Sequence, residues 1–142
     1  MPGCEIYSMR PLPKFKLSLI KLVKTHYKKN KRARDSFETL IQNYRETIAT
    51  DPFCDDSDSE NFPKGAYKPD FEFRKIRFLM PELQGASRKG RFMYVVHQAS
   101  CSVCPLWVYT HEEYPKRPSD QELKEQFTII EMNIVDIDPP PS

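Results

Sequence analysis

Arginine, lysine, tyrosine and histidine residues gather between positions 71 and 113, in a stretch that has the pattern of successive β-strands. They are Arg74, Arg77, Lys89, Arg91, Tyr94, Tyr109 and His111. This set lacks a carboxylate pair and a metal cluster, but it suits the binding and cleavage of a phosphodiester. An arginine grips two phosphate oxygens with its planar fork and stays charged while negative charge builds in the transition state.

Tyr109 and His111 are two positions apart, so on a strand both side chains project from the same face. A histidine there could act as general acid or base in ribonucleotide cleavage, and a tyrosine could stack on a base or share the proton transfer. RNA brings its own nucleophile, the 2′-OH, so such an enzyme needs no serine, cysteine or metal. A lone histidine at a strand end is more often a polar residue at the rim of a sheet, and that alternative stays open.

In two pairs of candidate residues, the members are an odd number of positions apart along the strand. Arg91 and Tyr94 are three positions apart, as are Arg74 and Arg77, so a regular strand points the members of each pair to opposite faces. One member of the Arg91–Tyr94 pair therefore faces the helices unless a bulge intervenes. The alternative is that these arginines lie on the surface and only add solubility.

The stretch predicts three strands. Apolar and charged residues mostly alternate from Phe71 to Met80, and short runs of aromatic and β-branched residues follow at Phe92 to Val96 and Leu106 to Tyr109. Turn-forming residues separate these runs: Pro81, Gly85, Gly90, Ser100, Ser102 and Pro105.

Two amphipathic helices are expected ahead of the strands. Apolar residues recur at helical spacing after Pro13, a residue that suits the first helical turn, and again from Phe37 to Ile48. The dipeptide Asp51-Pro52 ends the second helix. The basic run KKNKRAR turns the chain between them, which gives a helical hairpin whose apolar faces need a sheet to cover.

The two ends of the chain are expected to add a short strand and a helix. Glu5 to Leu12 could form a first strand, and Ser119 to Glu122 has the form of a capping box that starts a final helix. Periodicity leaves open whether Ile130 to Ile137 continues this helix. We expect one domain over residues 1–142, with an acidic, proline-rich loop at 51–70 and a disordered tail at 135–142.

The net charge of +2 hides a strong polarity along the chain. Nine lysines and arginines and no acid lie from Pro13 to Arg34, whereas Asp51 to Glu60 holds five acids and no base. A basic face beside acidic segments favours a polyanionic partner. A solvated helix face is the alternative interpretation.

Composition excludes several classes of function. No apolar run approaches the roughly 20 residues of a membrane span, and the N-terminus lacks a signal-peptide core. The four cysteines have no framework-like spacing, which predicts free thiols in a reducing cytoplasm. The Cys101-x-x-Cys104 motif lies between two strands and has too few partners for zinc. With four glycines and no glycine-rich phosphate loop, we expect neither cofactor nor metal.

Three segments, FEFRKIRF, GRFMYVV and LWVYTHEEYPKRPSDQELKE, resemble in order the strand motifs of the RelE/ParE superfamily of bacterial toxin–antitoxin toxins, its RelE-like and HigB-like branches above all. The resemblance covers about residues 10 to 130. It implies an α+β fold, a small antiparallel sheet of three to four strands packed against an N-terminal helical hairpin, with a C-terminal helix. The 51–70 loop and the residues around Leu83 to Lys89 depart from the family pattern.

The resemblance implies a function as well. Such toxins are mostly ribosome-dependent messenger-RNA endonucleases of the bacterial cytoplasm, and they cut RNA without metal, by 2′-OH attack on the adjacent phosphate. The family pattern places the catalytic cations and proton-transfer groups on the sheet and the RNA-binding residues on the hairpin turn and strand ends. The catalytic positions are Arg74, Arg77, Arg91, Tyr109 and His111, and the RNA-binding positions are Lys28, Lys29, Lys31, Arg32, Lys89 and Tyr94.

The resemblance also implies partners and leaves alternatives. The partners would be the ribosome with its messenger RNA and a cognate antitoxin, which forms a toxin–antitoxin hetero-oligomer; no membrane is involved. Tyr114 is a candidate for the C-terminal tyrosine that some members use as a base. A ParE-like inhibitor of DNA gyrase, or a non-catalytic RNA-binding relative, remains the alternative.

Overall fold

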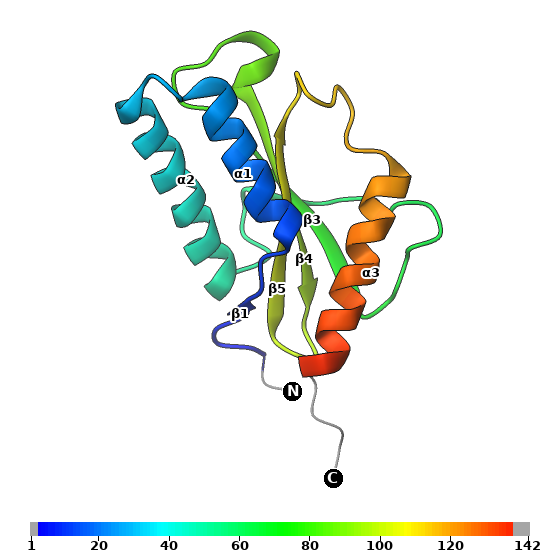
Figure 1. The fold of residues 1–142 in the computed structure, drawn as a ribbon. Helices are drawn as coiled ribbons and strands as arrows, with labels where there is room; N and C mark the ends of the chain where they lie inside the picture. The colour runs from blue at the N-terminus through cyan, green and yellow to red at the C-terminus, as the bar shows by residue number, and fades with distance from the viewer. Residues whose placement is uncertain (1–2, 138–142) are drawn as a thin grey trace.

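The computed structural model describes residues 3–137 and has an α+β fold built around one sheet (Figure 1). Its elements are β1 (Ser8–Met9), α1 (Pro13–His26), α2 (Lys31–Thr50), β2 (Ser57–Ser59), β3 (Phe71–Leu79), the 3₁₀ helix η1 (Gly85–Arg88), β4 (Lys89–His97), β5 (Ser102–Thr110) and α3 (Asp120–Ile137). The α+β class that we predicted is confirmed. Within residues 3–137, no helix is long and apolar enough to cross a membrane.

The sheet is larger than predicted and is mixed rather than antiparallel. Its five strands lie in the order β1-β5-β4-β3-β2. The short β1 pairs in parallel with β5, and the other neighbouring strands are antiparallel. The additional strand, β2, forms inside the acidic segment that we expected to be irregular. Three residues of that segment pair with β3, so the sheet extends by one strand there.

The helices cover both faces of the sheet. The α1–α2 hairpin lies on one side and α3 on the other (Figure 1). Phe15 and Phe37 of the hairpin pack with Phe92 of β4 in one core, and Phe127 of α3 packs with Phe73 of β3 in the second. Successive strand residues point to opposite faces, so β3 and β4 contribute to both cores. The β4–β5 register shifts between Met93 and Tyr94. As a result, the neighbouring residues Leu106 and Trp107 of β5 both belong to the second core.

The helix ends follow the chemistry of their flanking residues. Pro13 is the first residue of α1, and the Asn30 side chain caps α2 by accepting a hydrogen bond from the Ala33 amide at 3.0 Å. The Ser119 hydroxyl and the Glu122 carboxylate bond to each other's backbone amides at 3.2 and 3.4 Å. This reciprocal pair is the capping box that the sequence predicted for α3.

The ends of the chain resolve two questions that the sequence left open. Of the expected first strand, only Ser8–Met9 pairs with the sheet. Helix α3 runs to Ile137, so the segment from Ile130 continues the helix. The expected tail at 135–142 is therefore helical as far as Ile137, and residues 138–142 lie outside the described residues.

The expectation of four free thiols is wrong, because Cys4 and Cys101 form a disulfide. The chain brings residues 97 positions apart together because β1 runs beside β5, next to the β4–β5 turn that holds Cys101. Cys54 and Cys104 are free. The C-x-x-C motif therefore does not form its own bridge. Spacing along the chain could not show a pairing that depends on strand order.

Reduction of this disulfide should destabilise the fold. A crosslink that closes a loop of 97 residues restricts the unfolded chain and is worth about 4 kcal/mol. We expect Cys4→Ser to lower the free energy of unfolding by about that amount, measured by urea denaturation without reductant. Cys54→Ser is the matched control and should change little. Equal stability of the two variants would contradict the bridge.

Candidate functional site

Strand register brings three of the predicted catalytic residues into one row. Arg77 of β3 lies directly opposite Arg91 of β4, and Arg91 lies directly opposite Tyr109 of β5. Residues directly opposite each other in an antiparallel pair project from the same face. The row lies on the face that α3 covers, since Tyr109 belongs to the core beneath that helix. We call Arg77, Arg91 and Tyr109 the cross-strand row.

Lys89 and His111 form a second row at the end of the sheet. The His111 backbone amide donates to the Lys89 carbonyl oxygen at 2.9 Å, and Lys89 pairs with Leu79 of β3. Lys89 is two positions from Arg91 on β4 and therefore shares its face, and His111 directly follows the last residue of β5. Lys89 is exposed and His111 is half-buried. Five of the predicted residues thus occupy one corner of the sheet.

The arginines of the cross-strand row have few anionic partners. Arg91 is half-buried, donates to the Gly90 carbonyl oxygen at 2.9 Å, and forms no ion pair within residues 3–137. Burial and the neighbouring charge of Arg77 lower the pKa of Arg91. Arg77 has only an exposed ion pair with Asp58, at 3.5 Å. Like charges directly opposite on a sheet destabilise it by roughly 0.2–1 kcal/mol, so this pair suits an anion bound between its members.

Tyr109 is fully buried, and its hydroxyl has no hydrogen-bond partner among the described residues. The Tyr114 ring stands perpendicular to it, with the ring centroids 5.6 Å apart. Burial raises the pKa of Tyr109 well above its usual range, the Glu60 carboxylate raises it further, and the charges of Arg91, Arg117 and Arg77 oppose this shift. The phenol therefore stays protonated at neutral pH. It is a buried donor that faces a cluster of cations without a bond to any acceptor.

Three residues that sequence reasoning missed complete this corner. The Glu60 carboxylate bonds to Lys75 Nζ at 2.9 Å and to Arg117 Nη1 at 3.0 Å, and all three side chains are largely buried. Arg117 also contacts the Asn61 carbonyl oxygen at 2.6 Å and Asp120 at 3.1 Å. The two-residue period of β3, which puts Lys75 on the face of Arg77, could have indicated Lys75. No local pattern indicated Glu60 or Arg117.

Arg74 and Tyr94 lie on the opposite face, so the structure does not bring them into this corner. They pair across β3 and β4, and Tyr94 belongs to the core under the α1–α2 hairpin. Arg74 donates to Ser57 Oγ and to the Ser57 carbonyl oxygen, both at 2.9 Å. The Tyr94 hydroxyl lies 2.5 Å from Ser57 Oγ and from the Pro52 carbonyl oxygen. Both side chains hold β2 on the sheet.

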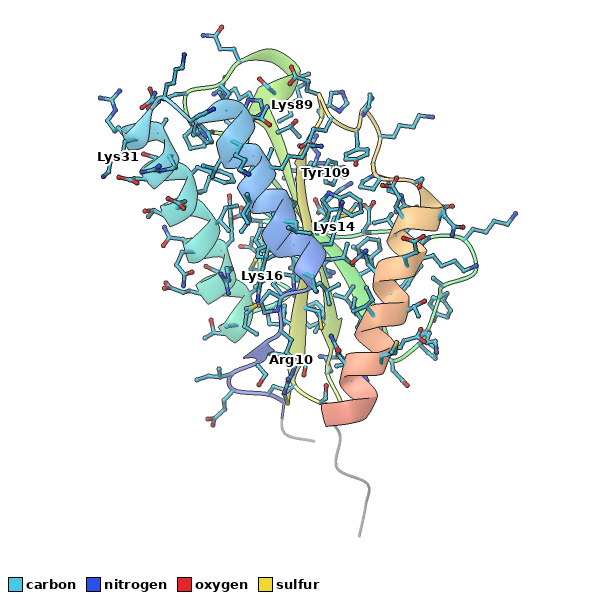
Figure 2. The ribbon with its side chains drawn as sticks, viewed as in Figure 1. Arg10, Lys14, Lys16, Lys31, Lys89 and Tyr109 are labelled. Carbon is cyan, nitrogen blue, oxygen red and sulfur yellow. A yellow bond between two sulfur atoms is a disulfide. The ribbon has the colours of Figure 1, made fainter. Side chains whose placement is uncertain are left out.

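The basic hairpin turn lies toward the same end of the molecule as Lys89 (Figure 2). The Tyr27 hydroxyl donates to the Pro81 carbonyl oxygen at 2.9 Å, which ties the turn to the segment after β3. Arg32 is paired with Glu82 at 3.4 Å, and Lys31 with Asp35 at 3.1 Å. The predicted RNA-binding cations of this turn are all exposed: Lys28, Lys29, Lys31 and Arg32.

The corner suits one kind of chemistry, the binding of an anion such as a phosphate. It offers two arginines, a lysine and a protonated phenol on one sheet face, with an imidazole two residues beyond the phenol. Within residues 3–137, no group of three or more histidine, cysteine or acidic side chains could hold a metal ion. Hydrogen-bond donors that are fixed in a partly buried site stabilise charge more strongly than donors in water.

No protein-family model, curated protein or solved structure matches this chain.

The unpartnered phenol gives a direct test of the site. A buried polar group without a bond costs about 1–3 kcal/mol, so Tyr109→Phe should leave the free energy of unfolding unchanged or raise it. Tyr94→Phe is the matched control. It removes a bonded hydroxyl and should lower the free energy of unfolding by about 1 kcal/mol. Urea denaturation measures both variants. A clear loss of stability in Tyr109→Phe would mean that its hydroxyl already has a partner in the free protein.

Proposed function

We propose that this chain is an endoribonuclease that cuts single-stranded messenger RNA by attack of the 2′-OH on the adjacent phosphate. One observation carries the proposal: Arg77 and Arg91 face each other across β3 and β4, and Arg91 forms no ion pair within residues 3–137. Two arginine forks on one face can hold the non-bridging oxygens of one phosphate. The same two charges stabilise the extra negative charge of the transition state.

The proposed reaction forms one bond and breaks another. The 2′-OH gives its proton to His111 as its oxygen attacks phosphorus, the bond from phosphorus to the 5′ oxygen breaks, and the leaving 5′ oxygen takes a proton from water. The products are a 2′,3′-cyclic phosphate and a 5′ hydroxyl. His111 is the proposed proton-transfer group, since an imidazole nitrogen can accept and donate a proton and this side chain is half-buried at the end of the sheet. Tyr109 stays protonated and serves as a hydrogen-bond donor to the phosphate once the Tyr114 ring that packs against it has moved aside. Lys89 binds the neighbouring phosphate of the chain.

The proposal extends to the ribosome and to an acidic partner protein. The exposed cations of the hairpin turn are the proposed contact with ribosomal RNA, which would weaken steeply with salt. The partner, an antitoxin, would place an amphipathic helix in a groove of about 420 Å³ between α1 and α2. The groove is lined by apolar side chains, among them Leu19, Ile20 and Ile41, and by two cations and one carboxylate, Lys24, Arg45 and Glu38. These cations complement an acidic helix.

A second candidate function is RNA binding without cleavage. The observation in its favour is that Tyr109 is fully buried with Tyr114 packed against it, which keeps the phenol from a bound phosphate unless Tyr114 moves. Gyrase inhibition, the other alternative from the sequence, has no comparable support from the residues described.

Cleavage during translation separates these functions. In a translation extract with a reporter messenger RNA, mapped by primer extension, we expect cuts at codon boundaries only when ribosomes translate. Arg91→Ala and His111→Ala should each reduce cleavage at least a hundredfold, because each removes transition-state stabilisation or proton transfer. Arg34→Ala, which removes a charge from α2, is the matched control and should cleave normally.

The other outcomes are equally informative. Intact messenger RNA with a folded protein that still binds RNA would leave the non-catalytic function. Inhibition of gyrase supercoiling that survives Arg91→Ala would favour the ParE-like alternative.

A further inference from the structure

A turn that follows β5, residues 112–114, packs against Tyr109 of the cross-strand row. The Glu113 and Tyr114 amides both donate to the Thr110 carbonyl oxygen, at 3.0 and 3.1 Å. These bonds are local, so they shape the turn but do not hold its side chains against the rest of the fold. Two long-range contacts do that, one made by Tyr114 and one made by Glu113.

The Tyr114 ring packs over two aromatic residues of β5. It stands nearly perpendicular to Tyr109 and to Trp107, with centroid distances of 5.6 and 5.7 Å. Aromatic pairs of this geometry stabilise the closed position of the ring. Tyr109 and Trp107 are buried, whereas Tyr114 is half-buried and borders solvent. The Tyr114 ring can therefore leave this position without displacing another element of the fold.

An ion pair holds the turn to α1. Glu113 Oε2 lies 3.0 Å from Lys21 Nζ, and the Glu113 side chain is 19% exposed, against 64% for Lys21. Helix α1 is within reach of the turn because the Ser18 hydroxyl accepts a hydrogen bond from the Val108 amide of β5 at 3.0 Å. An ion pair this exposed on its lysine side is worth at most about fivefold in an equilibrium constant.

The closed turn leaves unfavourable features beneath it. The Tyr109 hydroxyl has no partner within residues 3–137, and Arg77 lies directly opposite Arg91. A phosphate can contact all three groups only after the Tyr114 ring has moved, so it binds the open form more tightly than the closed form. A ligand with such a difference in affinity shifts the population toward the form that it prefers.

We propose that Glu113 and Tyr114 form a gate over the cross-strand row, closed in the free protein and opened by the RNA phosphate that binds Arg77 and Arg91. The Tyr114 ring is the part that moves, and the ion pair between Glu113 and Lys21 is the latch. This inference rests on the proposed function, because the gate regulates access to the same site. The apparent affinity for RNA then rises with the fraction of molecules in which the gate is open.

Trp107 reports the position of the gate, since it is the only tryptophan of the chain and packs against Tyr114. It is 3% exposed, so acrylamide should quench its fluorescence poorly in the free protein. The ligand is an all-uridine 2′-O-methyl octanucleotide, which cannot be cleaved. We expect saturating RNA to raise the acrylamide quenching constant of the full chain at least twofold. Arg91→Ala at the same RNA concentration should show no rise.

Two neighbouring carboxylates provide a matched pair of variants. Glu112 is exposed and forms no ion pair with any other described residue, so Glu112→Gln changes the charge of the turn without breaking the latch. We expect Glu113→Gln to bind the RNA about threefold to fivefold more tightly than Glu112→Gln, measured by anisotropy of the labelled octanucleotide. Tyr114→Ala removes the moving ring and should bind about tenfold more tightly than the wild type.

The outcomes separate the gate from the proposed phosphate site. If RNA binding depends on Arg91 but Trp107 stays protected and Glu113→Gln binds like Glu112→Gln, the phosphate site stands and the gate is overturned. If Arg91→Ala leaves RNA binding unchanged, the phosphate site is overturned. The free variants then decide the gate: Trp107 more accessible in Glu113→Gln than in Glu112→Gln supports it, and equal accessibility overturns it. Absence of RNA binding even by Tyr114→Ala would overturn both.

Discussion

The register of β3, β4 and β5 is the constraint on which the rest of this molecule depends. It sets Arg77, Arg91 and Tyr109 in one row, so that two like charges and an unpartnered hydroxyl meet on a partly buried face. Each of these features costs stability in the free protein. A bound anion would offset the repulsion between the arginines directly, and it would bond to the hydroxyl once Tyr114 moves aside. Binding of an anion at the cross-strand row would therefore gain free energy from the removal of interactions that destabilise the free protein.

The acidic segment around β2 supplies the carboxylates that pair with the cations around this row. On one face, Arg74 and Tyr94 bond to Ser57 and hold β2 against β3. On the other face, Asp58 and Glu60 reach the cations of the corner. Removing one partner of a buried ion pair costs several kcal/mol because it leaves the other charge uncompensated. The Glu60 carboxylate is therefore what allows Lys75 and Arg117 to stay beside the row.

Local chemistry made much of the fold predictable from sequence. Helical periodicity, Pro13 and the capping box at Ser119 predicted the helices, and the alternation from Phe71 predicted β3. Contacts between remote segments were not predictable. The Cys4–Cys101 bridge depends on the parallel pairing of β1 with β5, and β2 lies in a segment with the composition of a loop. The same limit applied to the site, where Glu60 and Arg117 join the corner only through tertiary packing.

The most direct test of the central claim is nuclear magnetic resonance of the arginine side chains during titration with a non-cleavable 2′-O-methyl RNA. If the cross-strand row holds a phosphate, the Nε–H resonances of Arg77 and Arg91 shift together and saturate at the same RNA concentration. The Arg34 resonance stays in place. Shifts confined to Arg32 and the lysines of the hairpin turn, with Arg77 and Arg91 unmoved, would contradict the account.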